Sequence, residues 1–177
     1  DGETCVELIE VPDAPYKGTG ISIGFVVDDV PAYHRMMEDK GYNCFACCPS
    51  NPYGLKMEFH EDGDDIVCMW EPHDNYQSWI GTLHGGIQAT LLDEAGGWVV
   101  SRKLQTTGMT THLNVRYRSS VPVGKGPLEI RARLKEMKRN FAFIDAEISH
   151  DGKVCTSCEM IYCTFSKEVA EKDFMFF

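Results

Sequence analysis

The chain has 177 residues, of which 43% are hydrophobic and 25% charged, proportions typical of a folded globular protein rather than a disordered one. Its 17 basic and 27 acidic residues give a formal charge of −10, which disfavours nucleic acid and anionic membranes as partners. No apolar run has the roughly 18 residues that a membrane-spanning helix needs. No signal-peptide pattern is recognised at the start of the sequence, and we expect a cytoplasmic location.

The basic residues are concentrated at 116–139, where eight lysines and arginines stand against two glutamates. Residues 1–75 hold 16 acids and four bases. The basic stretch fits either a local site for one anionic ligand or a solvent-exposed strand pair, and charge alone leaves both open.

The first predicted unit is an arm over residues 1–43, without an assigned role, that contains a short helix at 31–40. A turn-rich loop follows at 44–53, and then a hairpin with strands at 55–61 and 66–71. Four later segments alternate as strands do: 110–117, 128–138, 141–149 and 153–165. Residues 167–177 are assigned to a charged and aromatic C-terminal tail.

Between the two groups of strands lies a long apolar segment, 87–100, which predicts a helix buried on all sides. Two basic residues at its end, Arg102 and Lys103, suit the negative pole of a helix. The order of two strands, one helix and four strands predicts an α+β fold, with a curved antiparallel sheet packed against one helix.

Eight cysteines include the pairs Cys44-x-x-Cys47 and Cys155-x-x-Cys158, which have the spacing of zinc ligands. The second pair lies in a predicted strand, where residues three apart point to opposite faces, so it is not expected to bind one ion. Two more cysteines are interpreted as small core residues, Cys68 and Cys163. We predict ordinary thiols in a reducing environment, and no metal.

Asp93 and Glu94 stand out because they lie in the middle of the apolar helix. An ionised carboxylate in apolar surroundings is costly unless it is paired, so such a group is a candidate for function. The alternative is that one acid pairs with a neighbouring strand while the other faces solvent. The residue types leave both interpretations open.

His84, Gly85 and Gly86 stand at the start of the same helix. Two glycines leave the first N–H groups unobstructed, and the helix dipole favours negative charge there. The alternatives are a glycine pair that makes a tight turn and a histidine that only donates or accepts a structural hydrogen bond.

Distance separates these two candidate groups. Asp93 lies seven residues beyond Gly86, about 10 Å along a helix axis, so one small carbonyl can hardly reach both within one chain. If both serve one site, the second group comes from another subunit. Gly96 and Gly97 would allow close packing against a second helix or a sheet.

Three stretches carry a family resemblance: Cys44-Phe-Ala-Cys-Cys-Pro-Ser-Asn-Pro-Tyr-Gly-Leu55, His84-Gly-Gly-Ile-Gln-Ala-Thr-Leu-Leu-Asp93-Glu94-Ala, and Thr111-His-Leu-Asn-Val-Arg-Tyr117. Together they resemble the hotdog-fold acyl-CoA thioesterases, in particular the phenylacetate-pathway and 4-hydroxybenzoyl-CoA thioesterases of the second hotdog type. The resemblance assigns a hotdog thioesterase domain to residues 44–166.

This resemblance implies a sheet of about six strands wrapped around one long helix, in a homodimer or a dimer of dimers. It implies that Asp93 is the catalytic carboxylate, acting as general base or nucleophile. It also implies that the N–H of Gly85, with Gly86 beside it and His84 as the motif histidine, polarises the thioester carbonyl from the other subunit. No cofactor is expected.

Many family members have Asn or Gln six residues before the motif histidine, where this chain has Ser78, with Gln77 adjacent. The phosphates of coenzyme A are expected to contact cations of the basic stretch. The predicted substrate-binding residues are Gln77, Ser78, Glu94, Arg118, Arg139 and Asn140.

The predicted function is hydrolysis of an acyl-CoA thioester to free acid and coenzyme A. The alternative is a non-catalytic acyl-CoA or fatty-acyl binding module on the same fold, which Ser78 favours. An acyl-CoA hydratase is disfavoured, because the expected Asp-x-Asn-Pro-x-His segment is absent. The sequence leaves open the acyl chain length, an aromatic or aliphatic acyl group, and a dimer or tetramer.

Overall fold

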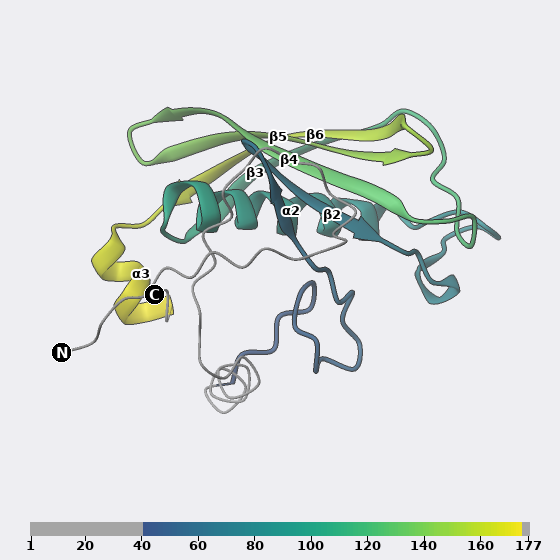
Figure 1. Cartoon of the computed structure of the whole chain (residues 1–177), viewed down its shortest axis with the longest axis horizontal. Coiled ribbons are helices and arrows are strands. Elements are labelled where there is room, and N and C mark those ends of the chain that lie inside the picture. Colours follow the sequence, from purple (N-terminus) through teal and green to yellow (C-terminus); the bar gives the residue numbers. More distant parts are fainter. Residues whose placement is uncertain (1–40, 175–177) are drawn as a thin grey trace, which may run out of the picture.

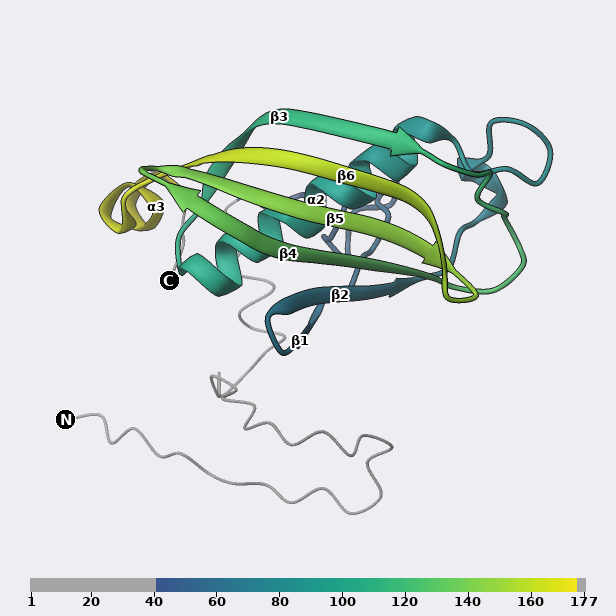
Figure 2. The ribbon, with the colours of Figure 1, turned by 90° about the horizontal axis from the view of Figure 1, so that it is seen from above.

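The computed structural model describes residues 41–174, so the predicted helix at 31–40 lies outside the described residues. A six-stranded antiparallel sheet with the order β1-β2-β4-β5-β6-β3 packs on one long helix, α2 (Gly85–Leu104). Figure 1 shows the sheet as one layer above α2, and Figure 2 shows the strands lying across the helix. The predicted α+β architecture of a sheet on one central helix is confirmed.

The strands are β1 (His60–Asp62), β2 (Asp65–Trp70), β3 (Gly108–Tyr117), β4 (Leu128–Lys138), β5 (Phe141–His150) and β6 (Lys153–Thr164). The four later strands match their predicted bounds within two residues. In β4, β5 and β6 the apolar residues that suggested a strand also form the buried face. On β5, for example, Ala142, Ile144 and Ile148 are buried in the core. A short 3-10 helix, η1 (Asp74–Tyr76), precedes α2.

The first predicted strand, 55–61, is wrong over most of its length. Leu55 and Met57 are buried as the alternation predicts, but their N–H groups donate to the carbonyls of Phe45 and Ala46. Lys56 between them has a left-handed φ of 54°, which interrupts an extended strand. The segment therefore pairs with the preceding loop, and only β1 joins the sheet.

The burial of α2 also differs from the prediction. Leu91, Leu92 and Val99 are fully buried in the core, but Asp93 and Trp98 are only partly buried. The sheet covers one side of the helix, and the loop after residue 40 runs on the other side (Figure 1). Burial on all sides is therefore wrong, because the loop is a thinner cover than a second sheet.

Strand β6 carries the second cysteine pair, and the argument that its side chains point to opposite faces is also wrong. Both Cys155 and Cys158 are buried in the core. A bulge causes this, since Ile148 pairs with Thr156 and Ser149 with Val154, which leaves Cys155 unpaired and breaks the alternation.

The segment predicted as a C-terminal tail contains a helix, α3 (Lys167–Phe174). Ala170 is fully buried, and the ring of Phe174 stacks on Phe165 with 5.0 Å between the centroids. None of the helices in the described range has an apolar stretch long enough to cross a membrane.

Asp65 links β2 to β4 and makes stability depend on pH. Arg133 donates to its Oδ1 at 2.6 Å and Arg131 to its Oδ2 at 2.7 Å, and these hydrogen bonds lower the pKa of the buried carboxyl. A lowered pKa stabilises the fold above the unfolded-state pKa of about 4, and this contribution is lost as the pH falls through the folded-state pKa.

We expect Asp65→Asn to lower the free energy of unfolding by about 2 kcal/mol at pH 7, and by much less at pH 3. Urea denaturation at the two pH values measures both effects. The control is Asp64→Asn, at an exposed neighbouring position in the turn between β1 and β2. An equal loss at both pH values would contradict an ionic role for Asp65.

Candidate active site

Asp93, half-way along α2, is held by two hydroxyl groups of the sheet. Thr110 Oγ1 donates to Asp93 Oδ1 at 2.7 Å, and Tyr162 Oη shares its one proton between the Asp93 main-chain carbonyl oxygen at 2.5 Å and Oδ1 at 2.9 Å. Burial raises the pKa of Tyr162, so this phenol stays protonated and is a donor. Thr110 therefore holds Asp93 through its carboxylate, and Tyr162 holds it through both the carboxylate and the main-chain carbonyl.

Thr110 belongs to β3, the strand at one edge of the sheet. Nearly every residue of β3 is exposed, and its register with β6 shifts between Thr110 and His112. Bulges of this kind redirect side chains, and they are frequent beside active sites. Asp93 therefore lies beside an irregular position of an edge strand.

The start of α2 is organised by His84. Its ring Nδ1 accepts the N–H of Gly86 at 2.9 Å, so the histidine caps the helix. The N–H of Gly85 has no acceptor among the described residues. Tyr117, the last residue of β3, donates its hydroxyl to the Gly85 carbonyl at 2.9 Å. Of the two predicted N–H groups, the one on Gly85 is available to a ligand.

Gly85 and Asp93 lie on one continuous helix, eight residues or about 12 Å apart along its axis. Within one chain, Gly85 and Asp93 therefore lie beside two different positions of β3. Thr110 marks the place beside Asp93, and Tyr117 marks the place beside Gly85.

Gln77 and Ser78 lie in the turn that leads to α2, and neither forms a hydrogen bond with Asp93. Gln77 Oε1 accepts the N–H of Gly81 at 3.0 Å, and the N–H of Ser78 donates to the Thr82 carbonyl at 2.8 Å. Both side chains are exposed. Within a single chain, the Gln77 amide therefore closes a turn and does not approach Asp93.

Glu94 points away from Asp93, toward the loop on the other side of α2. Trp98 Nε1 donates to its Oε1 at 3.1 Å, and Cys44 Sγ lies 3.7 Å from each carboxylate oxygen. Burial raises the pKa of Glu94 to about 7. The two neighbouring acids thus belong to different environments, one at the sheet edge and one under the loop.

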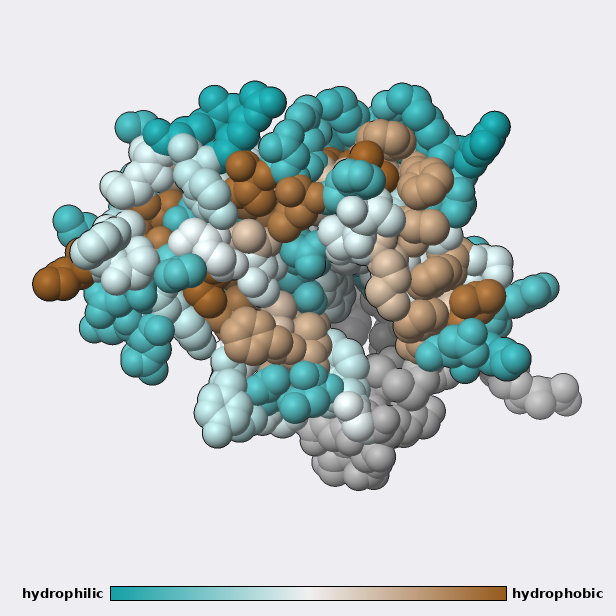
Figure 3. Space-filling view, turned by 180° about the vertical axis from the view of Figure 1, so that it is seen from behind, coloured by the Kyte–Doolittle hydropathy of each residue, from teal (hydrophilic) through white to brown (hydrophobic). Residues whose placement is uncertain are grey.

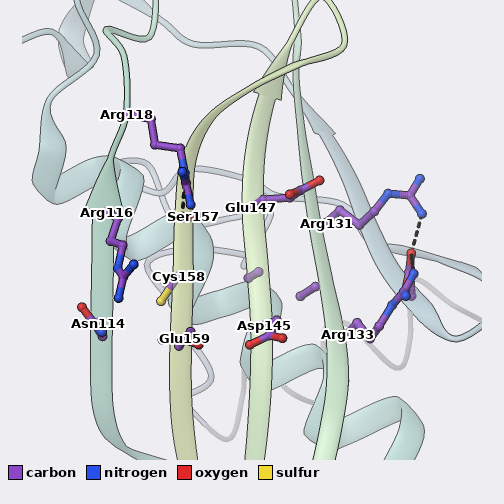
Figure 4. Close-up of a pocket in the computed structure, with 13 residues that line it drawn as sticks. Asn114, Arg116, Arg118, Arg131, Arg133, Asp145, Glu147, Ser157, Cys158 and Glu159 are labelled. Carbon is purple, nitrogen blue, oxygen red and sulfur yellow. Dashed lines mark hydrogen bonds and ion pairs between the residues drawn. The ribbon is translucent and has the colours of Figure 1, made fainter.

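The outer face of the sheet carries a pocket of ≈ 450 Å³ lined mostly by charged side chains (Figure 4). Arg131 and Arg133 are bound to Asp65 in this pocket, whereas Arg116 and Arg118 have no ion-pair partner among residues 41–174. Arg118 Nε donates to Ser157 Oγ at 3.2 Å. Four of the eight basic residues of the stretch are therefore paired with acids, and Arg116 and Arg118 are unpaired cations near the end of β3 within the described residues.

Arg139 and Asn140 form the turn between β4 and β5, where Arg139 has a left-handed φ of 57°. Asn140 lies beside Thr164, which pairs with Gly108 at the beginning of β3, whereas Arg118 follows its end. Since ten residues of strand span about 33 Å, Arg118 and Arg139 do not form one site within a single chain.

Sequence reasoning missed Thr110 and Tyr162, the two residues that contact the Asp93 carboxylate. Tyr162 falls on the inward register of β6, where a phenol needs a polar partner, and this is a usable signal. Thr110 had no such signal, because its contact depends on a bulge.

We expect Thr110→Ala to lower any turnover at this site about tenfold, because Asp93 loses one of the two donors that orient it. Thr110→Ser keeps the hydroxyl and is expected to retain most of the rate. Thr111→Ala is the control, since the Thr111 hydroxyl donates to the Ile161 carbonyl instead. Equal rates for the alanine and serine variants of Thr110 would contradict the role of its hydroxyl.

Comparison with known proteins shows what this fold is similar to. Residues 80–156 match the family model of the Thioesterase superfamily. A solved thioesterase superfamily protein superposes with a TM-score of 0.62 at 25% identity, over 68% of this chain and 62% of that one. The chain has a hotdog fold. Over residues 80–156 it is similar to the thioesterase superfamily.

Two further matches are more distant. A hypothetical thioesterase from Streptococcus pneumoniae, solved with coenzyme A, has a TM-score of 0.57 at 19% identity, over 63% of this chain and 90% of that one. Acyl-coenzyme A thioesterase 13 of Mus musculus is 23% identical over 88 residues, which are 49% of this chain and 62% of the mouse protein. The match thus spans less than two thirds of that relative.

Proposed function

We propose that this protein hydrolyses an acyl-CoA thioester to a free acid and coenzyme A. The observation that carries this proposal is the Asp93 carboxylate, oriented by Thr110 and Tyr162 beside an open sheet edge. Asp93 activates water as a general base or attacks the carbonyl itself, and the N–H of Gly85 stabilises the oxyanion. The thioesterase relatives and the coenzyme A-bound neighbour support the substrate class.

The two catalytic groups meet if two chains pair through β3. This strand forms one edge of the described sheet, and its exposed apolar side chains include Met109, Leu113 and Tyr117. Antiparallel pairing about a two-fold axis near Leu113 sets Thr110 of one subunit opposite Tyr117 of the other. Since Thr110 touches Asp93 and Tyr117 touches Gly85, each Asp93 would lie near the other subunit's Gly85.

The same pairing would bring together predicted coenzyme A contacts that lie far apart in a single chain. Arg118 and Asn140 lie at opposite ends of the sheet in one chain, but antiparallel β3 strands bring the Arg118 of one subunit to the Asn140 end of the other. Together with Arg116, they offer cations and an amide to the phosphates of one coenzyme A. A β3-paired homodimer is therefore the assembly that we propose.

The test of the proposed function is release of free thiol from short, medium, long and aromatic acyl-CoAs. Turnover of any member supports hydrolysis and identifies the acyl class. Saturable binding of the same acyl-CoAs without turnover would favour the non-catalytic binding module instead.

We expect Arg118→Ala to raise KM for acyl-CoA about fivefold with little change in kcat, because an exposed charge-assisted contact to phosphate is worth about 1 kcal/mol. The matched control is the same acyl group on N-acetylcysteamine, a thiol without the nucleotide. An equal loss on both substrates would contradict the assigned phosphate contact.

A further inference from the structure

The cluster formed by Cys44, Cys47 and Glu94 is not used by the proposed reaction. The sulfur and carboxylate oxygen atoms of these three residues lie within 4.8 Å of one another, and all three residues are partly buried. Within residues 41–174, this is the one group of three or more His, Cys, Asp or Glu residues with such convergence. Cys44 and Glu94 are 50 positions apart in sequence, so the fold brings them together.

The loop around Cys44 is a turn whose N–H groups point at sulfur. The N–H of Ala46 donates to Cys44 Sγ at 3.3 Å, and the N–H of Cys47 donates to the same sulfur at 3.4 Å. Hydrogen bonds to sulfur stabilise its thiolate form, which is the form that binds metal. A C-x-x-C turn of this kind also places its two sulfurs on one side, as metal ligands require.

Glu94 is oriented for the same purpose. Trp98 Nε1 donates to Oε1 at 3.1 Å, and ligating carboxylates are characteristically held by such outer contacts. Each carboxylate oxygen is 3.7 Å from Cys44 Sγ, and sulfur and oxygen ligands of one tetrahedral zinc ion lie about 3.5 Å apart.

Charge gives a second argument for a cation. Two thiols and a carboxyl group converge in a partly buried space, and no lysine or arginine of the described range forms an ion pair with Glu94. In their ionised forms these three groups would be costly to bury without a cation beside them. Thiolate ligands select zinc over magnesium or calcium, which prefer oxygen.

We propose that Cys44, Cys47 and Glu94 bind a zinc ion that fastens the loop after residue 40 to helix α2. The two thiols each release a proton when the ion binds, so the bound set carries three negative charges against the two positive charges of zinc. Water fills the fourth position of the tetrahedron. The strand cysteines, Cys155 and Cys158, are not part of this site, and helix α2 supplies its carboxylate ligand.

The test is to reduce the full chain, incubate it with zinc, remove unbound metal by gel filtration, and measure bound zinc by mass spectrometry. We expect about one zinc per chain in the wild type, and about tenfold less in the double variant Cys44→Ser, Cys47→Ser. Cys163→Ser is the control, since Cys163 contacts Asn140 at the far end of β6. Circular dichroism verifies that each variant is folded.

A second measurement does not depend on any cysteine variant. Cobalt bound to the wild type should show the intense visible bands of a tetrahedral site and the near-ultraviolet band of thiolate ligation. Glu94→Gln should keep the thiolate band and weaken binding about tenfold. The proposal is overturned if wild-type protein lacks the thiolate band, if the double variant binds as much zinc, or if reduced protein binds none. These readouts require no turnover, so they are independent of the proposed hydrolysis.

Discussion

Asp93→Asn should reduce thioester hydrolysis about a thousandfold, a loss in the middle of the range for removing a general base. Asparagine has nearly the same shape and can still accept hydrogen bonds from Thr110 and Tyr162, so the fold should be preserved. The amide can neither take a proton from water nor attack the carbonyl. Thiol release from the best acyl-CoA of the panel measures the effect.

The matched control is Asp151→Asn, the same change at an exposed hairpin turn, which should keep the full rate. Retention of wild-type activity by Asp93→Asn would remove Asp93 from the mechanism. Loss of activity in both variants would point to a general effect of charge rather than to a catalytic group.

A proline at position 85 tests the other half of the site. Gly85 is the first residue of α2, where the missing N–H of proline is tolerated, and His84 before it is already extended as proline requires. Gly85→Pro should therefore keep the helix and lower kcat about a hundredfold, as loss of one oxyanion donor does. Gly85→Ala, which retains the N–H, is the control.

Mixing these two inactive variants tests the dimer. If Asp93 and Gly85 act from different subunits, a mixed dimer of Asp93→Asn and Gly85→Pro contains one site with both groups intact. Half of the randomly exchanged dimers are mixed, so about a quarter of the wild-type activity should return. No recovery after verified subunit exchange would place both groups of each site on one chain.

The parts of this fold that local pattern determines could be predicted from sequence. Strands β3 to β6 follow from alternation, and the start of α2 follows from His84, Gly85 and Gly86. The first hairpin strand was misplaced because the alternation at Leu55 and Met57 reports burial, and a loop can provide burial without a ladder partner. Local pattern thus predicts which side chains are inside, and it predicts their backbone partners less well.

The candidate site divides in the same way. Asp93 and Glu94 were candidates because a charge in an apolar helix is unusual, and the family resemblance favoured Asp93. Thr110 and Tyr162 are 17 and 69 positions away from it, and their contacts depend on strand register and on a bulge. The partnership of Glu94 with Cys44 likewise requires the loop to fold back on the helix. Residue types can be read from the sequence, but the long-range strand register that brings these residues together cannot.

Gly96 connects this packing to the site, and we expect its substitution to change both stability and activity. A Cβ at Gly96 would overlap Met160 Sδ and lie 3.1 Å from the ring of Tyr162, both of which are buried on β6. The neighbouring Gly97 has only the Tyr162 hydroxyl nearby, 3.6 Å from an added Cβ. The sequence prediction of close packing therefore holds for Gly96 against the sheet.

Gly96→Ala should destabilise the fold by about 2 kcal/mol, because overpacking outweighs the gain of about 1 kcal/mol in helix propensity. Gly97→Ala makes the same change one position later without the overlap, so it should stabilise the fold by up to about 1 kcal/mol. Urea denaturation of both variants measures the difference. Gly96→Ala should also lower turnover, because displacement of the Tyr162 ring moves the hydroxyl that orients Asp93. Equal stabilities for the two variants would mean that Met160 moves aside at no cost, and would contradict tight packing of α2 on β6 at Gly96.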